Sequence, residues 1–179
     1  IKNVKLSGIY VYGTRYIGGV VGQNTTLGSV FNCSVSSGDI EADDGINEIY
    51  AGGIIGYNEG FVEGTFSNNA NLKIKNESSS AVAGGIIGKN NSIYSVEITN
   101  STNTGNISAS GSENTYCGGL VGINTSAVEI TNSTNTGNVS SSSSDLYSYS
   151  GGFVAHNGSG TLTITDCTNA GNVSSSSLN

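Results

Sequence analysis

The sequence predicts an all-β protein: a parallel β-helix (β-solenoid) of about five coils of ~33 residues, each with three short strands, which we expect to be right-handed. Three observations predict it: a fivefold internal repeat, short runs in which apolar and polar residues alternate, and a composition with 27 Gly and no Pro. Only 35% of the residues are hydrophobic and 11% are charged, against about 45–50% and 25% in ordinary globular domains. The composition therefore favours a fold with a thin core.

The first repeated element is a Gly-Gly-aliphatic-aliphatic-Gly-x-Asn segment. Its five copies begin at Gly18, Gly52, Gly84, Gly118 and Gly151, which are 34, 32, 34 and 33 residues apart. One such unit cannot bury its apolar edge alone, but copies stacked at ~4.8 Å share one continuous core. We therefore interpret residues 1–179 as a single β-solenoid domain.

The second repeated element follows each Gly-Gly segment. Residues 96–107 recur almost unchanged at 128–139 and with substitutions at 162–173, and weaker copies lie at 30–40 and 62–72. The Val-x-Ile pairs in this element alternate apolar with polar residues, which predicts strands, and Gly, Asn and Ser separate the runs as turn residues do. No window carries the apolar stripe of a helix.

Two roles follow from the first element. Its last residue is always Asn, and we expect these residues to hydrogen-bond to one another in a column, as amide ladders do in stacked sheets. The column would contain Asn24, Asn58, Asn90, Asn124 and Asn157. The Gly-Gly pairs are expected at a bend that needs either a positive φ or a close backbone approach.

The two adjacent aliphatic residues of each Gly-Gly segment should point to opposite faces of a strand. We expect the second of each pair to line the interior: Val21, Ile55, Ile87, Val121 and Val154. The first of each pair would then form an outer apolar stripe: Val20, Ile54, Ile86, Leu120 and Phe153. Either the linkers near residues 47–50 and 147–149 cover this stripe, or it is an exposed contact surface.

These two elements resemble a known repeat family. The Gly-Gly-(Ile/Leu/Val)-(Ile/Val)-Gly-x-Asn segments, followed by Ile-Thr-Asn-x-Thr-Asn-x-Gly-Asn-(Ile/Val), are similar to the GLUG-type repeats of large secreted and surface-anchored bacterial proteins. Those proteins include adhesin-like proteins and the non-catalytic N-terminal region of immunoglobulin A peptidases. The resemblance covers roughly residues 15–175, and the fifth copy departs from it at Ala155. It implies an extracellular stalk or binding module.

The three cysteines are expected to be free. Cys33 and Cys167 occupy the same position of the second element in the first and fifth repeats, so four coils separate them by roughly 19 Å. A disulfide needs Cα atoms within about 7 Å. Cys117 belongs to a different column, and the three spacings fit no metal-binding pattern.

We predict no catalytic, cofactor-binding or metal-binding residues. His156 is the only histidine, and its position holds Gln23, Tyr57, Lys89 and Ile123 in the other repeats, which indicates a surface position. A glycosidase needs two carboxyl groups about 5–9.5 Å apart. Glu63, Glu97 and Glu129 fall in one column, but on the outward side of a strand with no Trp, Arg or His around them.

The acidic segment 41–48 superficially resembles a calcium-binding loop. It lacks the Asp-x-Asp-x-Asp-Gly spacing of such loops. We therefore expect a mobile surface loop rather than a calcium site.

The net charge of the chain limits the classes of partner that it is expected to bind. The chain carries 13 acidic and 6 basic residues, a net charge of −7, so we expect neither nucleic acid nor an anionic membrane as a partner. No apolar run approaches the ~20 residues that span a bilayer. The opening Ile-Lys-Asn-Val has no signal peptide, and we expect a piece of a longer protein.

The functional prediction is a non-enzymatic structural or adhesive repeat module of an extracellular bacterial surface protein, without cofactors. A host protein, a glycan or a neighbouring domain of the same chain would be its partner. The alternative is a substrate-positioning, non-catalytic region of a large secreted peptidase. A zinc-binding His-Glu-x-x-His elsewhere in the full-length protein would favour the peptidase.

Overall fold

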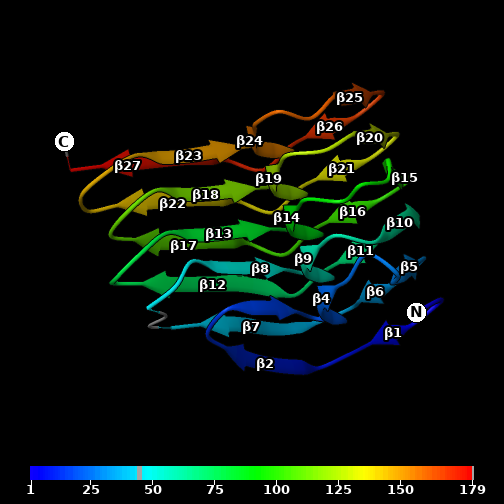
Figure 1. The fold of residues 1–179 in the computed structure, drawn as a ribbon, viewed down its shortest axis with the longest axis horizontal. Helices are drawn as coiled ribbons and strands as arrows, with labels where there is room; N and C mark the ends of the chain where they lie inside the picture. The colour runs from blue at the N-terminus through cyan, green and yellow to red at the C-terminus, as the bar shows by residue number, and fades with distance from the viewer. Residues whose placement is uncertain (44–45, 179) are drawn as a thin grey trace.

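The protein is a stack of parallel coils (Figure 1). The computed structural model describes residues 1–43 and 46–178, and in this part of the chain it has 27 strands and no helix. The first coil begins at β3 and the fifth ends at β27, while β1 and β2 precede the first coil. Each coil has five short strands rather than the expected three, because the chain bends more often than the apolar runs indicate.

Corresponding strands of successive coils form five sheets. The first sheet contains β3 (Tyr16–Gly18), β8 (Ile49–Gly52), β13 (Ala81–Gly84), β18 (Thr115–Gly118) and β23 (Ser148–Gly151). The second contains β4 (Val21–Asn24), β9 (Ile55–Asn58), β14 (Ile87–Asn90), β19 (Val121–Asn124) and β24 (Val154–Asn157). The third contains β5 (Ser29–Phe31), β10 (Phe61–Gly64), β15 (Val96–Thr99), β20 (Val128–Thr131) and β25 (Leu162–Thr165).

The fourth and fifth sheets have six strands each, because β1 and β2 extend them at the N-terminal end. The fourth contains β1 (Lys5–Leu6), β6 (Ser34–Val35), β11 (Ser67–Asn68), β16 (Thr102–Asn103), β21 (Thr134–Asn135) and β26 (Thr168–Asn169). The fifth contains β2 (Ile9–Gly13), β7 (Gly38–Ala42), β12 (Asn71–Asn76), β17 (Ile107–Gly111), β22 (Val139–Ser143) and β27 (Val173–Ser177).

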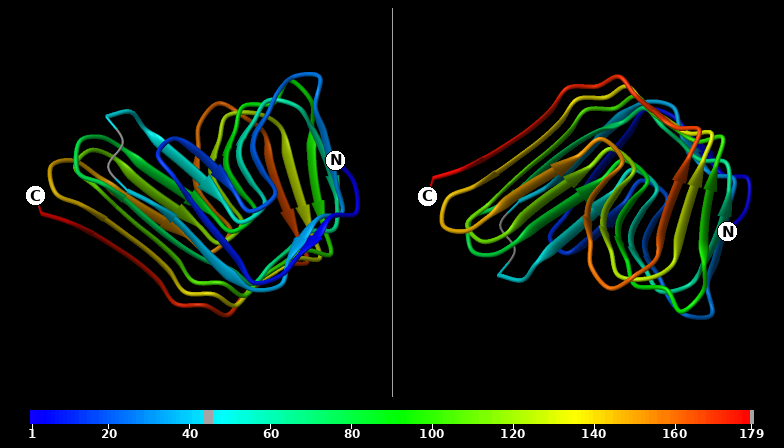
Figure 2. Two further views of the ribbon diagram at one scale, coloured as in Figure 1. Left: turned by 90° about the horizontal axis from the view of Figure 1, so that it is seen from below. Right: turned by 90° about the horizontal axis from the view of Figure 1, so that it is seen from above.

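Views along the stack show a bent, two-lobed coil (Figure 2). The first and fifth sheets face each other in one lobe, and the second to fourth sheets enclose the other. Seen from above, the chain runs anticlockwise as it rises toward the viewer, so the coil is right-handed.

The parallel pairing of the Gly-Gly segments confirms the predicted register. Ile87 lies opposite Ile55 on one side and Val121 on the other, in parallel pairs. The inner column predicted from the second aliphatic residues is also correct, because all five pack in or against the core.

The predicted outer apolar stripe is wrong. Ile54, Ile86 and Leu120 are fully buried in the same core as their neighbours, and Val20 and Phe153 pack against it. The backbone bends between the two aliphatic residues, and one carbonyl accepts from two successive amides: the N–H groups of Ile54 and Ile55 both donate to Ile86 O, at 3.1 and 2.9 Å. Strand alternation is interrupted there, so both side chains face inward. The linkers do not cover a stripe: Ile49 of the first linker is itself part of the core, and Tyr147 of the second is 59% exposed.

The glycines of the bend are required by close backbone approach. A Cβ on Gly52 would lie 1.9 Å from Ile55 O, and a Cβ on Gly85 would lie 2.1 Å from Gly119 O of the next coil. Neither glycine has a positive φ. Of the two predicted reasons for the Gly-Gly pair, the close approach is the one that applies.

Two asparagine ladders run along the stack. The predicted ladder is confirmed: each side-chain amide donates to the next side-chain carbonyl at 2.8–3.0 Å, from Asn24 through Asn58, Asn90 and Asn124 to Asn157. A second ladder, which was not predicted, joins Asn68, Asn103, Asn135 and Asn169 at 2.7–2.9 Å. It packs against the Gly-Gly bends, since a Cβ on Gly85 would lie 2.6 Å from Asn103 Cγ.

The core becomes more polar toward the C-terminal end. Inward positions of the first and fifth sheets hold Ile49 and Ile74 in the early coils. In the last coils serines take these positions, and Ser141 Oγ hydrogen-bonds to Ser148 Oγ at 2.6 Å and Ser150 Oγ at 2.8 Å. Hydroxyl pairs thus replace part of the apolar packing, as the low apolar content of the sequence implies.

Candidate functional site

The candidate site is a surface formed by two columns of outward side chains, which we call the tyrosine surface. The first sheet contributes Tyr16, Tyr50, Val82, Tyr116 and Tyr149, one from each coil. The second sheet contributes Gln23, Tyr57, Lys89, Ile123 and His156, again one from each coil. Only the Gly-Gly bend separates the two sheets in sequence.

The two columns pack against each other although both point away from the core. Tyr50, Val82 and Ile123 form a second hydrophobic cluster and are 5%, 0% and 9% exposed. The rings of Tyr16 and Tyr57, from different sheets, stack with centroids 5.0 Å apart. This burial occurs because the chain turns at the Gly-Gly bend so that the outer faces of the two sheets approach each other.

The C-terminal half of the tyrosine surface repeats this arrangement. The rings of Tyr116 and Tyr149 are 5.0 Å apart and nearly parallel, at 6°. The His156 ring lies 5.5 Å from Tyr116 and 6.1 Å from Tyr149. Tyr149 and His156 are exposed, so this half presents aromatic faces to solvent.

The N-terminal half contains a pocket of about 320 Å³, which we call the Arg15–Lys89 pocket. It is lined by Arg15, Tyr16, Ile46, Asn47, Glu48, Tyr50, Tyr57, Ser79 and Lys89. Lys89 Nζ donates to the Tyr50 hydroxyl at 3.3 Å and lies 4.9 Å from the centre of its ring. The guanidinium of Arg15 lies 4.9 Å from the centre of the Tyr16 ring.

Tyr50, Tyr57 and Tyr116 keep their phenolic protons at neutral pH, because the pKa of each is raised. Burial, together with the hydrogen bond that its hydroxyl donates to Glu48, raises the pKa of Tyr50 far above its usual range. Burial also raises the pKa of Tyr57, with a contribution from Glu59, and that of Tyr116. These hydroxyls can therefore both donate and accept hydrogen bonds.

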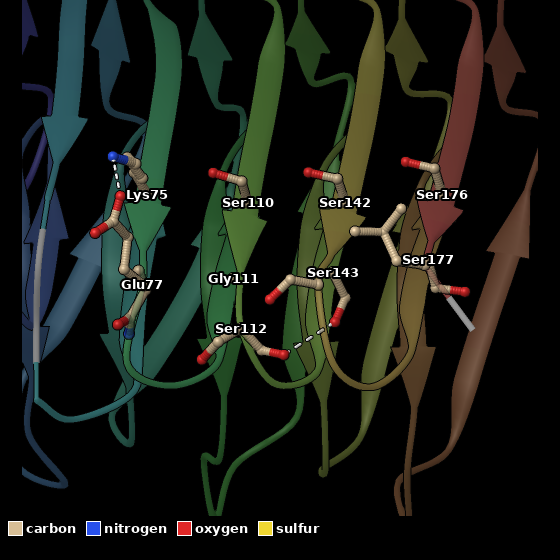
Figure 3. A pocket seen from close by; sticks show the side chains of 12 residues that line it. Lys75, Glu77, Ser110, Gly111, Ser112, Ser142, Ser143, Ser176 and Ser177 are labelled. Atoms are coloured by element: carbon tan, nitrogen blue, oxygen red, sulfur yellow. Dashed lines mark hydrogen bonds and ion pairs between the residues drawn. The ribbon is translucent and has the colours of Figure 1, made fainter.

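A second cavity, of about 510 Å³, lies at the carboxyl ends of the fifth-sheet strands β12, β17, β22 and β27 (Figure 3). Ser110, Ser142 and Ser176 form one row in it, in register on successive strands. Lys75 and Glu77 form an ion pair at one end. Seven of its twelve lining residues are serines, and the ion pair leaves it without a net charge.

The histidine, the glutamates and the cysteines singled out in the sequence lie where they were predicted, and among the described residues they form no common metal-binding cluster. His156 is on the surface, and Glu63, Glu97 and Glu129 form one exposed column on the third sheet. Cys33, Cys117 and Cys167 are all free. Cys33 and Cys167 belong to the column that holds Phe66, Ser101 and Ser133 in the other coils.

The calcium question for segment 41–48 falls partly outside the described residues, which exclude 44 and 45. Glu41 belongs to strand β7 and hydrogen-bonds to the Tyr10 hydroxyl at 2.9 Å. Glu48 belongs to the Arg15–Lys89 pocket instead. Among the described residues, no group of three His, Cys, Asp or Glu side chains is arranged to hold a metal ion.

Sequence reasoning missed the tyrosine surface, although a signal was present. A tyrosine precedes the first glycine of the Gly-Gly pair by two residues in four of the five repeats: Tyr16, Tyr50, Tyr116 and Tyr149. The alternation of Ile49, Tyr50 and Ala51 places this tyrosine outward. The approach of the second sheet, which half-buries it, depends on the bend.

Comparisons with known proteins identify the repeat. The described residues contain no helix that is long and apolar enough to cross a membrane. No curated protein and no solved structure gives a significant match to the chain. Residues 13–41, from the end of β2 to β7, match the family model of the GLUG motif. The chain thus carries a GLUG motif in the first of its five stacked coils, as its sequence resemblance implied.

Proposed function

We propose that the protein is a non-enzymatic structural and adhesive repeat module of an extracellular bacterial surface protein, and that the tyrosine surface is its contact surface. The observation that carries the proposal is the alignment of tyrosines from four of the five coils in one outward column. Such a column repeats the same side chain at intervals that are multiples of ~4.8 Å. This spacing suits an elongated partner that contacts several coils at once.

Tyrosine is well suited to this role. It offers a large, rigid apolar ring and a hydroxyl, and it loses little conformational entropy when it is fixed at an interface. Tyr149, the most exposed tyrosine of the column, is 38% exposed. Contact there would bury ring surface that the fold leaves in solvent.

The stack supplies the structural part of the function. Parallel pairing and the two asparagine ladders connect every coil to the next. The tyrosine surface is therefore ordered before a partner arrives, and binding pays a smaller entropic cost. The GLUG motif supports a surface location because it resembles repeats of secreted and surface-anchored proteins.

Adhesion of coated beads tests the proposal. Beads carrying the purified chain should adhere to layers of epithelial cells more strongly than beads carrying serum albumin. The double variant Tyr57→Ser, Tyr149→Ser should reduce the number of adhering beads about tenfold, since interface tyrosines commonly contribute 1 kcal/mol or more each. The control is Tyr12→Ser, whose side chain is 58% exposed on the fifth sheet.

Two results would contradict the proposal. The first is equal adhesion of beads carrying the chain and beads carrying albumin. The second is a double variant that adheres as well as the unchanged chain, while circular dichroism shows both proteins to be folded.

A further inference from the structure

The Arg15–Lys89 pocket combines residues from three coils. Arg15 and Tyr16 come from the start of the first coil, Asn47 to Tyr57 from the second, and Lys89 from the third. The Tyr50 amide donates to Arg15 O at 2.7 Å, which fixes the backbone of the first coil against the second. The pocket is therefore part of the stacked framework rather than of one loop.

The pocket is locally cationic in an acidic protein. Its lining side chains include Arg15, Lys89 and one carboxylate, Glu48, a formal charge of +1 among them, whereas the whole chain carries −7. A further carboxylate, that of Glu113, lies behind the lining and accepts a hydrogen bond from the Ser79 hydroxyl at 3.1 Å. Glu48 accepts the hydrogen bond from the Tyr50 hydroxyl. In the part of the chain that the structure describes, the one ion pair within 4.0 Å is Lys75 with Glu77, on the fifth sheet. The two cations of the pocket are held by aromatic rings instead.

Cations held on aromatic rings remain able to bind an anion. A cation–π contact uses the face of the ring and leaves the other N–H donors of Lys and Arg available. Carboxylates are natural partners for these donors, because charge-assisted hydrogen bonds are shorter and stronger than neutral ones. The neutral phenol of Tyr57 adds a donor without adding negative charge, whereas the Tyr50 hydroxyl already donates to Glu48.

We propose that the Arg15–Lys89 pocket binds a carboxylate-bearing sugar residue of an acidic glycan. Lys89 and Arg15 bind the carboxylate, the tyrosine rings contact the sugar ring, and Asn47, Ser79 and Glu48 hydrogen-bond to its hydroxyls. The volume of about 320 Å³ suits one or two sugar residues and lies at the small end of ligand pockets. The inference rests on the proposed adhesive function and names the class of its partner.

The position of the pocket favours a glycan over an acidic peptide. Extended peptides commonly bind by adding a strand to an open sheet edge. The pocket lies on the faces of the first two sheets, where strands β8 and β9 are paired on both sides. β3, which carries Tyr16, is the end strand of the first sheet, but the side chains of the lining project from the sheet faces rather than along that edge. The hydroxyl and amide groups of the lining match the many hydroxyls of a sugar.

Calorimetric titration tests the inference. The probes are trigalacturonic acid, 3′-sialyllactose and a hyaluronan tetrasaccharide, and the uncharged controls are the methyl ester of trigalacturonic acid and lactose. At least one acidic probe should bind, with an affinity at least about tenfold above that of its uncharged control. Raising NaCl to 0.5 M should weaken this binding, because salt screens the partly exposed charges.

Variants assign the binding to the pocket. Lys89→Gln should lower the affinity for the acidic probe about tenfold, and Tyr50→Phe, which removes the hydroxyl beside Lys89, should lower it less. Lys75→Gln removes a cation from the fifth sheet and should leave the affinity unchanged. Thermal melting of each variant verifies that it is folded.

Three results would overturn the inference: no binding of any acidic probe, equal binding of acid and ester, or tighter binding of tetraglutamate than of every acidic sugar. Unchanged affinity in folded Lys89→Gln would equally place the binding elsewhere. The proposed function fails separately, because beads that do not adhere while the acidic sugar binds contradict adhesion alone. If beads adhere through the tyrosine surface while no acidic sugar binds, only the proposed glycan ligand of the pocket is contradicted.

Discussion

At the scale of single residues, asparagine and glycine determine how closely the coils stack. Asn103 illustrates this: its amide donates to Asn135 Oδ1 at 2.8 Å and to Gly105 O at 2.9 Å, and its carbonyl accepts from Asn68 at 2.9 Å. Such a buried amide is stabilising only while all its bonds are made. Gly85 then has to lack a side chain, because the ladder fills the space beside it.

Replacing Asn103 with Ala should destabilise the protein by about 2–3 kcal/mol, because the amide groups of Asn68 and Asn135 lose a buried partner. Urea denaturation followed by circular dichroism measures the change. The control Asn172→Ala, at an exposed position of the last coil, should cost less than about 0.5 kcal/mol. Equal costs at the two positions would show that the ladder contributes nothing.

Replacing Gly85 with Ala should cost about 3 kcal/mol, because the new methyl group would overlap Gly119 O and the Asn103 side chain. Gly158→Ala is the matched control, since its nearest neighbours would be 3.5 Å from the new Cβ. The same urea denaturation compares the two. A Gly85→Ala variant as stable as Gly158→Ala would rule out the close approach.

The cysteines give a chemical test of burial. Cys117 is fully buried, and burial raises the pKa of its thiol above the usual range. We expect Ellman's reagent to leave Cys117 unmodified in the native protein and to count three thiols in guanidinium. A count of one thiol in guanidinium would mean that a disulfide joins two of them and that the register is wrong.

At the scale of elements, the repeated segments were predictable and their bends were not. Period, parallel pairing and the first asparagine ladder follow from sequence, because identical residues recur at one position of each coil. The division of each coil into five strands does not follow, because strands such as Thr102–Asn103 are two residues long and leave no alternation to detect. The tyrosine surface was missed because its two columns pack together only at the angle that the Gly-Gly bend sets between the first two sheets.

Ionisation of Tyr50 should lower the free energy of unfolding at alkaline pH. The pKa of Tyr50 is raised in the folded state above the unfolded value near 10. The folded protein therefore holds a proton that the unfolded chain releases, and stability is lost as pH rises above about 10. Urea denaturation between pH 8 and 11 should show this decline, with a smaller decline in Tyr50→Phe. An identical pH dependence in Tyr50→Phe and in Tyr12→Phe would contradict it.

At the scale of the whole molecule, each coil is stabilised mainly by its neighbours, as in other solenoids. Side chains of the central coils, such as Ile86 and Ile98, are fully buried, whereas Ile164 and Val173 of the last coil are each 41% exposed. The stability of a coil should therefore depend on its place in the stack.

Hydrogen exchange should follow this gradient. Amides of β13 to β17 in the third coil should exchange most slowly, and those of β25 to β27 most rapidly, because the last coil is paired on one side only. Mass spectrometry of peptic peptides measures these rates. Uniform protection from the first coil to the fifth would contradict the nearest-neighbour account.

The central claim is that equivalent residues stack in register along the solenoid. Tyr12, Glu41, Lys73, Ser108, Ser140 and Ser174 form one outward column of six strands. Distances between spin labels on this column measure the stacking directly. The repeat itself supplies replacements for the native thiols: Cys33→Ser, Cys117→Ala and Cys167→Ser.

Labels at Tyr12→Cys and Ser174→Cys are five strand spacings apart, which at ~4.8 Å each predicts backbone positions about 24 Å apart. Labels at Glu41→Cys and Ser174→Cys are four spacings apart, which predicts about 19 Å. Pulsed electron–electron double resonance should therefore show two narrow distance distributions whose centres differ by about one strand spacing. Equal distances for the two pairs, or a larger distance for the second pair, would contradict parallel stacking in register.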